Sequence, residues 1–428
     1  MEMFDQKDQL ILPAPGVEAV WQGRKKVYMK KLIVEHETLV KAVKKASASL
    51  KDTFVLKIIS VEVGKGQLQG SLSCCNDSTQ AVIYIPVKAD NDACGEYIFG
   101  KEFGTIVQTL SVYDDKDFII KCNSDGMCTI ACGNADVPIP VCNSTASIPL
   151  QDIAANGALV VECKAESFRE AAVRGGCAYS GNIGGAYEIV RNVINLVLEK
   201  TEKQYNLQFI TSDGMSASIA RAQIVKQSGL DNLKDGEASF CVNATVFLKI
   251  ASAISSESVT LYLAKTQILL RDGNDVYIIV PNANTFPVSI GIMLRAELPT
   301  GYRFKVAKKR LLAAMDVASL GNDQETKYKV CAMVEDGKLT ISSVDGACSS
   351  RPEIAEISGA VKIAFNSTRL RSLFGHGGED ILICGAGAEA PIYISDGVDG
   401  ARCLLSPATL ESEKVSEKSG SKNGSSKK

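Results

Sequence analysis

The sequence predicts an α+β fold of three tandem modules, each with two helices backed by antiparallel sheets. Segments with helical periodicity recur, each is followed by alternating apolar strands around a glycine turn, and this order occurs three times. Repeats that keep one order of elements usually stack as similar modules. We place the modules at residues 28–145, 146–298 and 299–410.

The first module opens with a helix over residues 34–50, where Leu39, Val43, Ala46 and Leu50 recur at spacings of three and four. Strands follow it on both sides of a turn at Gly64–Gly66. A second helix is expected over residues 99–113, and a hairpin is expected over residues 117–132.

The second module repeats this order with a helix over residues 164–178 and a hairpin that turns at Asp213–Gly214. Its later helix covers residues 242–256, with Asn243 as the expected N-cap. The third module opens with a helix over residues 305–320 and turns at Asp336–Gly337. Its later helix covers residues 366–376, and Asn366 or Ser367 is the expected N-cap.

The two ends differ from these modules. Residues 1–27 show no clear period, so we expect an N-terminal extension with little structure of its own. Residues 411–428 are mostly Ser, Lys, Gly and Glu, which predicts a disordered tail because almost nothing there can be buried.

Composition excludes several classes of protein. Lys and Arg number 47 and Asp and Glu 49, so the whole chain is not a basic nucleic-acid binder. No uncharged apolar run approaches the length of a membrane span, and we expect no membrane association. The 14 cysteines are scattered without repeated spacing, which favours small buried hydrophobes in a reducing cytoplasm.

The sequence gives little support to catalysis. His36 and His376 are the two histidines, and each is expected to be an ordinary surface or capping residue. The cysteines at 122, 128 and 132 lack zinc-knuckle spacing, and no phosphate-binding or dinucleotide-binding glycine motif is present. We therefore expect no metal, no cofactor and no enzymatic activity. A cysteine nucleophile at Cys177 or Cys331 is the remaining enzymatic alternative to a buried structural role.

Charge is segregated toward the six predicted helices. They carry fourteen basic and six acidic residues, a net charge of +8, whereas the whole chain carries −2. Lysines on amphipathic helices usually face solvent. A net positive charge spread over six helices, however, also suits contact of these helices with one shared polyanion. Lys41, Lys44 and Lys45 are the first candidates for phosphate contact. The full candidate set is Lys41, Lys44, Lys45, Lys101, Arg169, Arg174, Lys249, Lys308, Lys309, Arg310, Arg369 and Arg371.

Four segments give the chain a family resemblance over residues 28–410. ITSDGMSASIA (210–220), TFPVSIGIML (285–294), LLAAMDVASLGN (311–322) and IAFNSTRLRSLF (363–374) agree in order and spacing with the bacterial DNA polymerase III β sliding clamps. The chain thus resembles a divergent member of this DNA processivity factor family.

The resemblance implies three clamp-like domains per chain and a homodimeric ring, with the helices lining a hole around double-stranded DNA. Ring closure in the family pairs an edge strand of the first domain with the partner's third domain. The corresponding regions here are the strand around Met127–Cys132 and the region beside Leu320. The implied function is a non-enzymatic clamp that tethers the replicative DNA polymerase and is loaded by a clamp loader. A monomeric clamp-like adaptor or inhibitor, which keeps the partner pocket without closing a ring, is the alternative.

The same resemblance places a partner-peptide pocket between the second and third domains. Here Met215-Ser216-Ala217 replaces the family's usual His-Arg-Leu run. The positions that match the family's pocket are Ser212, Gly214, Met215, Ser216, Ala217, Pro287, Ile292, Leu404 and Ser406.

Overall fold

A computed structural model of the chain forms two compact units. Unit 1 comprises residues 1–214 and 218–291, and unit 2 comprises residues 215–217 and 292–428. The structure describes residues 18–22, 25–49, 53–89, 91–114, 116–123, 126–142, 158–180, 190, 192–200, 205–230, 237–283, 285–374, 378–397 and 401–408. No helix among these residues is both long and apolar enough to cross a membrane.

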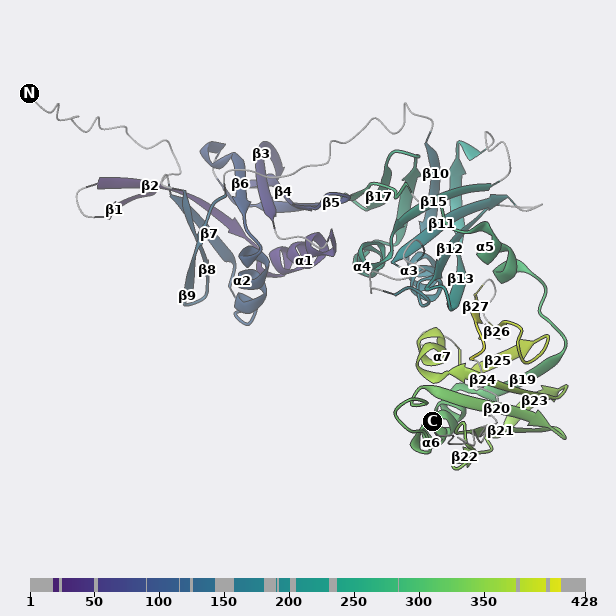
Figure 1. Cartoon of the computed structure of the whole chain (residues 1–428). Coiled ribbons are helices and arrows are strands. Elements are labelled where there is room, and N and C mark those ends of the chain that lie inside the picture. The colour runs from purple at the N-terminus through teal and green to yellow at the C-terminus, as the bar shows by residue number, and fades with distance from the viewer. Residues whose placement is uncertain are drawn as a thin grey trace, which may run out of the picture. The chain divides into compact units, whose positions relative to one another are not determined.

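The first repeat lies in unit 1 (Figure 1). Its two α-helices are each followed by a set of antiparallel strands. Its elements are β1 (Glu18–Gln22), β2 (Lys25–Val34), α1 (His36–Ala46), η1 (Ser47–Ser49), β3 (Phe54–Gly64), β4 (Gln67–Cys75), β5 (Thr79–Val87), η2 (Asn91–Ala93), β6 (Gly95–Phe99), α2 (Glu102–Leu110), β7 (Phe118–Asn123), β8 (Met127–Cys132) and β9 (Ala135–Pro140).

The second repeat follows in unit 1, except for residues 216 and 217, and again alternates strands with two α-helices. It consists of β10 (Leu159–Lys164), α3 (Ala165–Gly175), β11 (Val193–Lys200), β12 (Tyr205–Ser212), β13 (Ser216–Ala222), β14 (Ile224–Ser228), β15 (Glu237–Asn243), α4 (Ala244–Ala253), β16 (Ser258–Leu263), β17 (Ile268–Asp272) and β18 (Asp275–Ile279). A short helix, α5 (Val288–Arg295), comes next in the chain and was not expected from the sequence.

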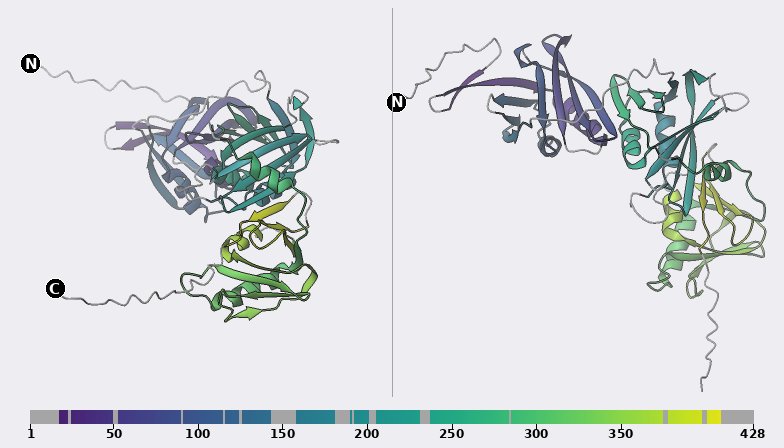
Figure 2. Two further views of the ribbon diagram at one scale, coloured as in Figure 1. Left: turned by 45° about the vertical axis from the view of Figure 1, so that its right-hand side comes forward. Right: turned by 45° about the horizontal axis from the view of Figure 1, so that its top comes forward.

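The third repeat lies in unit 2. It consists of β19 (Tyr302–Ala307), α6 (Lys308–Leu320), β20 (Lys329–Glu335), β21 (Lys338–Ser342), β22 (Ser349–Ser350), β23 (Ile354–Ser358), β24 (Val361–Asn366), α7 (Ser367–Phe374), β25 (Asp380–Gly385), β26 (Ile392–Ser395) and β27 (Arg402–Leu405). Figure 2 shows α6 and α7 on one side of the strands of this unit.

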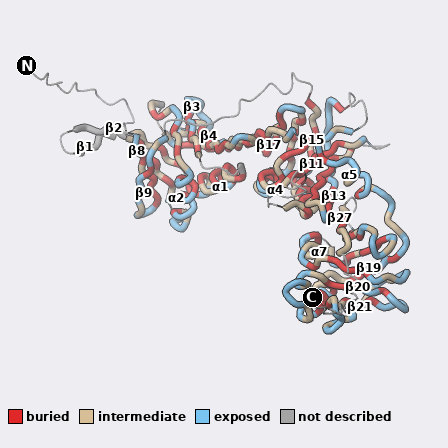
Figure 3. The backbone as a smooth tube through the Cα atoms, in the orientation of Figure 1, coloured by how far each residue is buried: buried red, intermediate tan, exposed pale blue. Residues whose placement is uncertain are grey.

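A continuous sheet joins the first two repeats. Its nine strands run β14-β10-β16-β17-β18-β5-β4-β3-β6, and the repeats meet where β5 pairs with β18. In register, Val82 lies opposite Val276 and Ala81 lies opposite the buried Tyr277. Ala81, Tyr277, Ile278 and Ile279 of this ladder are buried (buried residues are red in Figure 3), and the two repeats form one compact unit.

The predicted fold class and elements are confirmed. All six predicted helices are present, and strands flank the glycine turns at Gly66, Gly214 and Gly337. The Asn243 side chain accepts a hydrogen bond from the Val246 N–H at 3.0 Å, and Asn366 accepts one from Arg369 at the same distance. Both asparagines are therefore the expected N-caps.

Three expectations were wrong. Residues 18–22 and 25–27 belong to the paired strands β1 and β2 and not to a structureless extension. His36 is buried at 8% exposure and stacks on Phe118, because it opens α1 on its inner face. Cys122 and Cys128 form a disulfide across β7 and β8, where the register places them opposite each other. His376 and residues 411–428 lie outside the described residues.

Candidate nucleic-acid interface

Helices α2, α1, α4 and α3 of unit 1 form a row beside its sheets (Figure 1). Helix α1 packs against α2 in the first repeat, and α4 packs against α3 in the second. Helices α1 and α4 also contact each other where the two repeats meet (Figure 1). The row therefore gives unit 1 one helical face that crosses both repeats.

Helix α1 places two predicted contact residues on that outer face. Its inner face buries Leu39, Val43 and Ala46, whereas Lys41 and Lys44 are exposed. Residues three positions apart lie on the same side of a helix, so these two lysines are neighbours. Their ammonium groups have no carboxylate partner within 4.0 Å among the described residues.

Further unpaired lysines follow the helices. Lys101 precedes α2 and Lys249 lies on the outside of α4, and both are exposed. At the start of α6 in unit 2, Lys308 is half-buried and Lys309 is exposed. Within the described part of the chain, none of these four lysines forms an ion pair. Their positive charges remain available to an anion.

The predicted arginines of unit 1 are less available. Arg169 is half-buried, and its guanidinium donates a hydrogen bond at 3.0 Å to the carbonyl of Ile254, just after α4. Arg174 in the last turn of α3 is also half-buried. The Arg169 bond links α3 to the end of α4 and so supports the helix row.

The arginines of unit 2 have acidic neighbours. Arg310 forms an ion pair with Glu353 at 2.9 Å. Arg371 pairs with Asp316 and thereby joins α7 to α6. Arg369, the remaining predicted arginine, is half-buried on α7. These pairs reduce the net positive charge that α6 and α7 present.

Lys45 is not on the exposed face. Its ammonium nitrogen lies 2.7 Å from Asp272 and 2.6 Å from Asp275, and its side chain is 10% exposed. The two aspartates flank the β17–β18 turn of the second repeat. Because both carboxylates already hold this ammonium group away from solvent, we withdraw Lys45 from the proposed DNA contacts.

The buried ion triad, defined as Lys45, Asp272 and Asp275, is hydrogen-bonded further. Asp272 accepts from the backbone N–H groups of Ser255 at 3.1 Å and Ser256 at 2.8 Å. Asp275 accepts from the Tyr84 N–H of β5 at 3.1 Å. Buried carboxylates need such donors to compensate for lost water, so the triad is a built structural element.

Contacts within the triad shift the pKa values of Lys45 and Asp272. Burial favours a raised pKa for Asp272, but hydrogen bonds from Lys45 and Ser256 outweigh burial and hold the pKa below its ordinary value. Burial would lower the pKa of Lys45, but the hydrogen bonds to both aspartates raise it above its ordinary value. Lys45 and Asp272 are therefore charged near neutral pH.

The positions matched to the family's partner pocket are divided between the two units. In unit 1, Ser212 is buried and Pro287 is exposed. In unit 2, Met215 is 38% exposed, and its backbone carbonyl accepts a hydrogen bond from the Ser406 N–H at 2.8 Å. Ile292 is 61% exposed on α5. Ser216, Ala217 and Leu404 are buried, Gly214 is half-buried, and Ser406 is half-buried.

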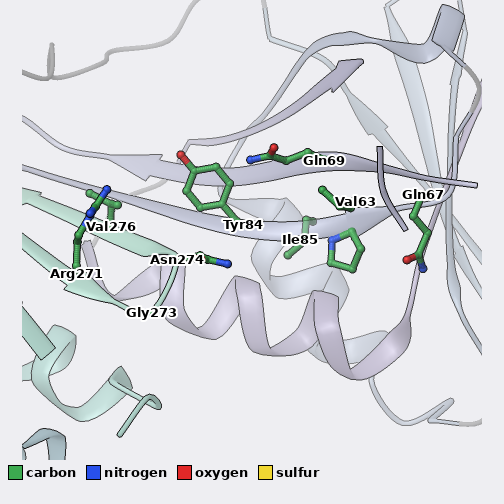
Figure 4. Close-up of a pocket in the computed structure, with 10 residues that line it drawn as sticks. Val63, Gln67, Gln69, Tyr84, Ile85, Arg271, Gly273, Asn274 and Val276 are labelled. Atoms are coloured by element: carbon green, nitrogen blue, oxygen red, sulfur yellow. The ribbon is translucent and has the colours of Figure 1, made fainter. Parts of the chain in front are cut away.

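A cavity of about 650 Å³ lies beside the junction of the two repeats in unit 1 (Figure 4). Tyr84 lines it from β5, and Gln67 and Gln69 line it from β4. Arg271 on β17 is the only charged residue of its lining. Sequence patterning gave no signal for this cavity, because its walls come from distant strands.

Of the two cysteines proposed as nucleophiles, Cys331 has a thiol that is hard to ionise. Cys331 is buried in β20, and burial raises the pKa of its thiol, which opposes thiolate formation. Cys177 is half-buried just after α3. No cluster of three or more His, Cys, Asp or Glu residues suited to a metal ion occurs among the described residues.

Comparison with solved structures identifies the fold. The β sliding clamp of C. crescentus matches 89% of this chain and 100% of its own, with a TM-score of 0.71 and 16% identity. The DNA polymerase sliding clamp of Bacillus subtilis matches 89% of this chain over 99% of its own length, with a TM-score of 0.70 and 14% identity. The sliding clamp of Bartonella birtlesii bound to griselimycin matches 89% of this chain over 100% of its own length, with a TM-score of 0.71 and 16% identity.

The chain therefore has the bacterial sliding-clamp fold, as the four sequence motifs predicted. No protein-family model and no curated protein matches the chain. At these identities, the similarity establishes the architecture, and the chemistry of this chain follows from its own residues.

Proposed function

We propose that the chain is a non-enzymatic DNA sliding clamp of the cytoplasm, in which two copies close a ring around double-stranded DNA. The observation that carries this proposal is the row of helices with unpaired lysines on a sliding-clamp fold that spans 89% of the chain. Lys41, Lys44, Lys101 and Lys249 supply the positive charge in unit 1, and Lys308 and Lys309 supply it in unit 2.

The chemistry of these lysines suits sliding. Ammonium groups on flexible side chains attract phosphates without reading base edges, so contacts form and break as the duplex moves. A ring does not need tight binding, because a closed circle of protein is retained topologically. A modest number of exposed lysines is therefore sufficient.

We further propose that the clamp recruits its DNA polymerase and clamp loader through an extended peptide. Met215 and Ile292 are exposed apolar side chains that fit the role of contacts for apolar peptide residues. Ser406, which like Met215 and Ile292 belongs to unit 2, completes this proposed surface. The Met215-Ser216-Ala217 run carries no positive charge, which favours an apolar peptide over an acidic one.

Retention on plasmid DNA tests the ring. After loading, the protein should remain on a closed circular plasmid through moderate salt, and cutting the plasmid once should release it. Equal release from circular and linear DNA would contradict the proposal. Sedimentation should give a mass near twice 45.7 kDa, whereas a monomer at micromolar concentration would favour an adaptor.

Charge variants test the helical face. Lys41→Ala with Lys44→Ala should lower the salt dependence of DNA binding by about one in log–log slope per lysine. Lys65→Ala is the matched control, because Lys65 is exposed at the β3–β4 turn of the same unit. An equal effect of the control would show that the helix row is not the DNA-binding face.

A further inference from the structure

The junction cavity, defined as the cavity of about 650 Å³ that Tyr84 and Arg271 line (Figure 4), lies on the face of the nine-stranded sheet opposite α1. Successive residues of a strand point to opposite faces of the sheet. Asp272 of β17 is buried and holds Lys45 of α1, so its neighbour Arg271 points to the other face. The registers of β17, β18 and β5 place Tyr84 on the same face as Arg271.

Arg271 is held in place without using its hydrogen-bond donors. Its guanidinium lies over the Tyr262 ring of β16, with 6.0 Å between Cζ and the ring centroid. Such stacking fixes the orientation of the planar group. Arg271 is exposed, and among the described residues its guanidinium forms no hydrogen bond and has no carboxylate within 4.0 Å. The donors of an oriented cation are therefore available to a ligand.

Apolar side chains gather around the same cavity. Tyr84 of β5 is 41% exposed, and Val63 at the end of β3 is 52% exposed. Pro86, two positions after Tyr84 on β5, is half-buried in the same lining. Single exposed apolar residues are common, but several that line one concave surface are typical of a ligand contact. The cavity therefore offers an apolar contact beside the guanidinium of Arg271.

Amide side chains complete the lining. Gln67 and Gln69 contribute them from β4, and Asn274 contributes one from the β17–β18 turn. An amide group both donates and accepts hydrogen bonds, as the N–H and carbonyl groups of a peptide backbone do. A peptide that enters the cavity can therefore exchange its bonds to water for bonds to these side chains.

Charge indicates which kind of ligand fits. Arg271 is the one charged residue of the lining, whereas a nucleic-acid backbone is held by several cations. A single carboxylate matches a single guanidinium through two parallel hydrogen bonds. The volume of about 650 Å³ lies within the range of ordinary ligand pockets and exceeds what one carboxylate fills. The lining therefore suits a carboxylate that is followed or preceded by an apolar group.

We propose that the junction cavity binds an extended acidic peptide of a partner protein, with an Asp or Glu carboxylate on Arg271 and a neighbouring apolar side chain against Tyr84 and Val63. This site shares no residue with the proposed surface around Met215 and Ile292, and it does not depend on closure of a ring. Because it lies on the sheet face opposite α1, DNA on the helix row leaves it open.

Binding of two peptide pools tests the proposal. Both are fluorescein-labelled hexapeptides that are randomised over Ala, Ser, Leu, Ile, Val and Phe, with Glu fixed at the third position in one pool and Gln in the other. Fluorescence polarisation with the full chain should show the Glu pool binding at least about tenfold more tightly, because bonds between guanidinium and carboxylate are charge-assisted. Equal binding of the two pools would overturn the proposal.

Variants of the lining locate the binding site. Arg271→Gln should abolish the preference for the Glu pool, whereas Arg221→Gln should keep it, since Arg221 is exposed on β13 of the same unit and does not line the cavity. Tyr84→Ala should weaken binding of the Glu pool about fivefold. A preference that survives Arg271→Gln would overturn the site, and unchanged binding by Tyr84→Ala would overturn its apolar contact. Thermal unfolding checks that each variant is folded.

Competition with DNA separates this inference from the proposed function. An excess of double-stranded oligonucleotide should leave the affinity for the Glu pool unchanged, because the cavity and the helix row lie on different faces. Displacement of the peptides by DNA would overturn the placement of the site. The peptide measurements use the free chain, so a failure of plasmid retention would contradict the clamp function alone.

Discussion

Replacing Lys45 by methionine should destabilise unit 1 by about 3–5 kcal/mol, because breaking a buried ion pair from one side leaves uncompensated charge. The Asp272 side chain is fully buried and that of Asp275 is 11% exposed, so water cannot replace the lost ammonium group. Methionine retains much of the length of the side chain, which limits the loss of packing.

Lys44→Met is the matched control, one position away on the same helix. Lys44 is exposed and has no ion pair among the described residues, so its replacement should change stability by less than about 0.5 kcal/mol. Hydrogen exchange of the Val82 and Val276 amides reports the opening of the β5–β18 ladder. Equal effects of the two lysine variants would refute the reasoning.

A triple variant tests the electrostatic origin of the loss. Adding Asp272→Asn and Asp275→Asn to Lys45→Met removes the uncompensated charges, and the amide oxygens can still accept from Ser256 and Tyr84. Stability should recover relative to Lys45→Met, because removing all the charges of a buried set is often close to neutral. No recovery would point to packing as the main contribution of Lys45.

Three further outcomes are expected. The lowered pKa of Asp272 means that its contribution to stability is complete above about pH 4 and is lost as the pH falls through the folded-state pKa. The raised pKa of Lys45 means that the contribution of its ammonium group to stability is lost only above about pH 10.5. Lys45→Met should therefore flatten both the acidic and the alkaline limb of the pH–stability curve measured by urea unfolding. Asn243→Ala should cost about 1 kcal/mol by removing the N-cap of α4, and Asn243→Ser should cost less. Gly175→Ala should destabilise unit 1 by more than about 2 kcal/mol, because its Cβ would lie 2.4 Å from the Phe209 carbonyl, whereas Gly387→Ala meets no atom within 4 Å and should be close to neutral.

The sequence predicted the elements whose signals are local. Apolar spacing supported the helix predicted over residues 34–50, and all six predicted helices are present. The turns at Gly66, Gly214 and Gly337 located the hairpins, since left-handed backbone at these positions favours glycine. The repeated order then supplied the fold class. Each of these signals lies within a few residues of the element that it specifies.

Contacts between distant segments had no comparable signal. Lys45 follows Lys44 directly, and only the tertiary structure shows that the first is buried and the second exposed. Its partners Asp272 and Asp275 flank a hairpin turn, where aspartate is common for local reasons. The pairing of β1 with β2 and the position of β9 outside β8 likewise depend on the sheet and not on local pattern.

Asp272 links the stability of unit 1 to its proposed DNA-binding face. Its carboxylate binds Lys45 near the end of α1 and accepts from Ser255 and Ser256 just after α4, so one group fixes the ends of both helices. Lys41 on α1 and Lys249 on α4 are thereby held relative to each other. Asp272→Ala should therefore reduce retention on circular DNA at temperatures where the chain is still folded, although Asp272 itself contacts no DNA.

Asp380→Ala is the control for this last prediction. Asp380 forms an ion pair with Lys305 at 3.4 Å in unit 2, and both side chains are half-exposed. Retention should be unchanged in this variant, because an exposed pair contributes little to stability. If Asp272→Ala also retains full binding while its β5–β18 amides exchange faster, the arrangement of α1 and α4 does not govern DNA binding.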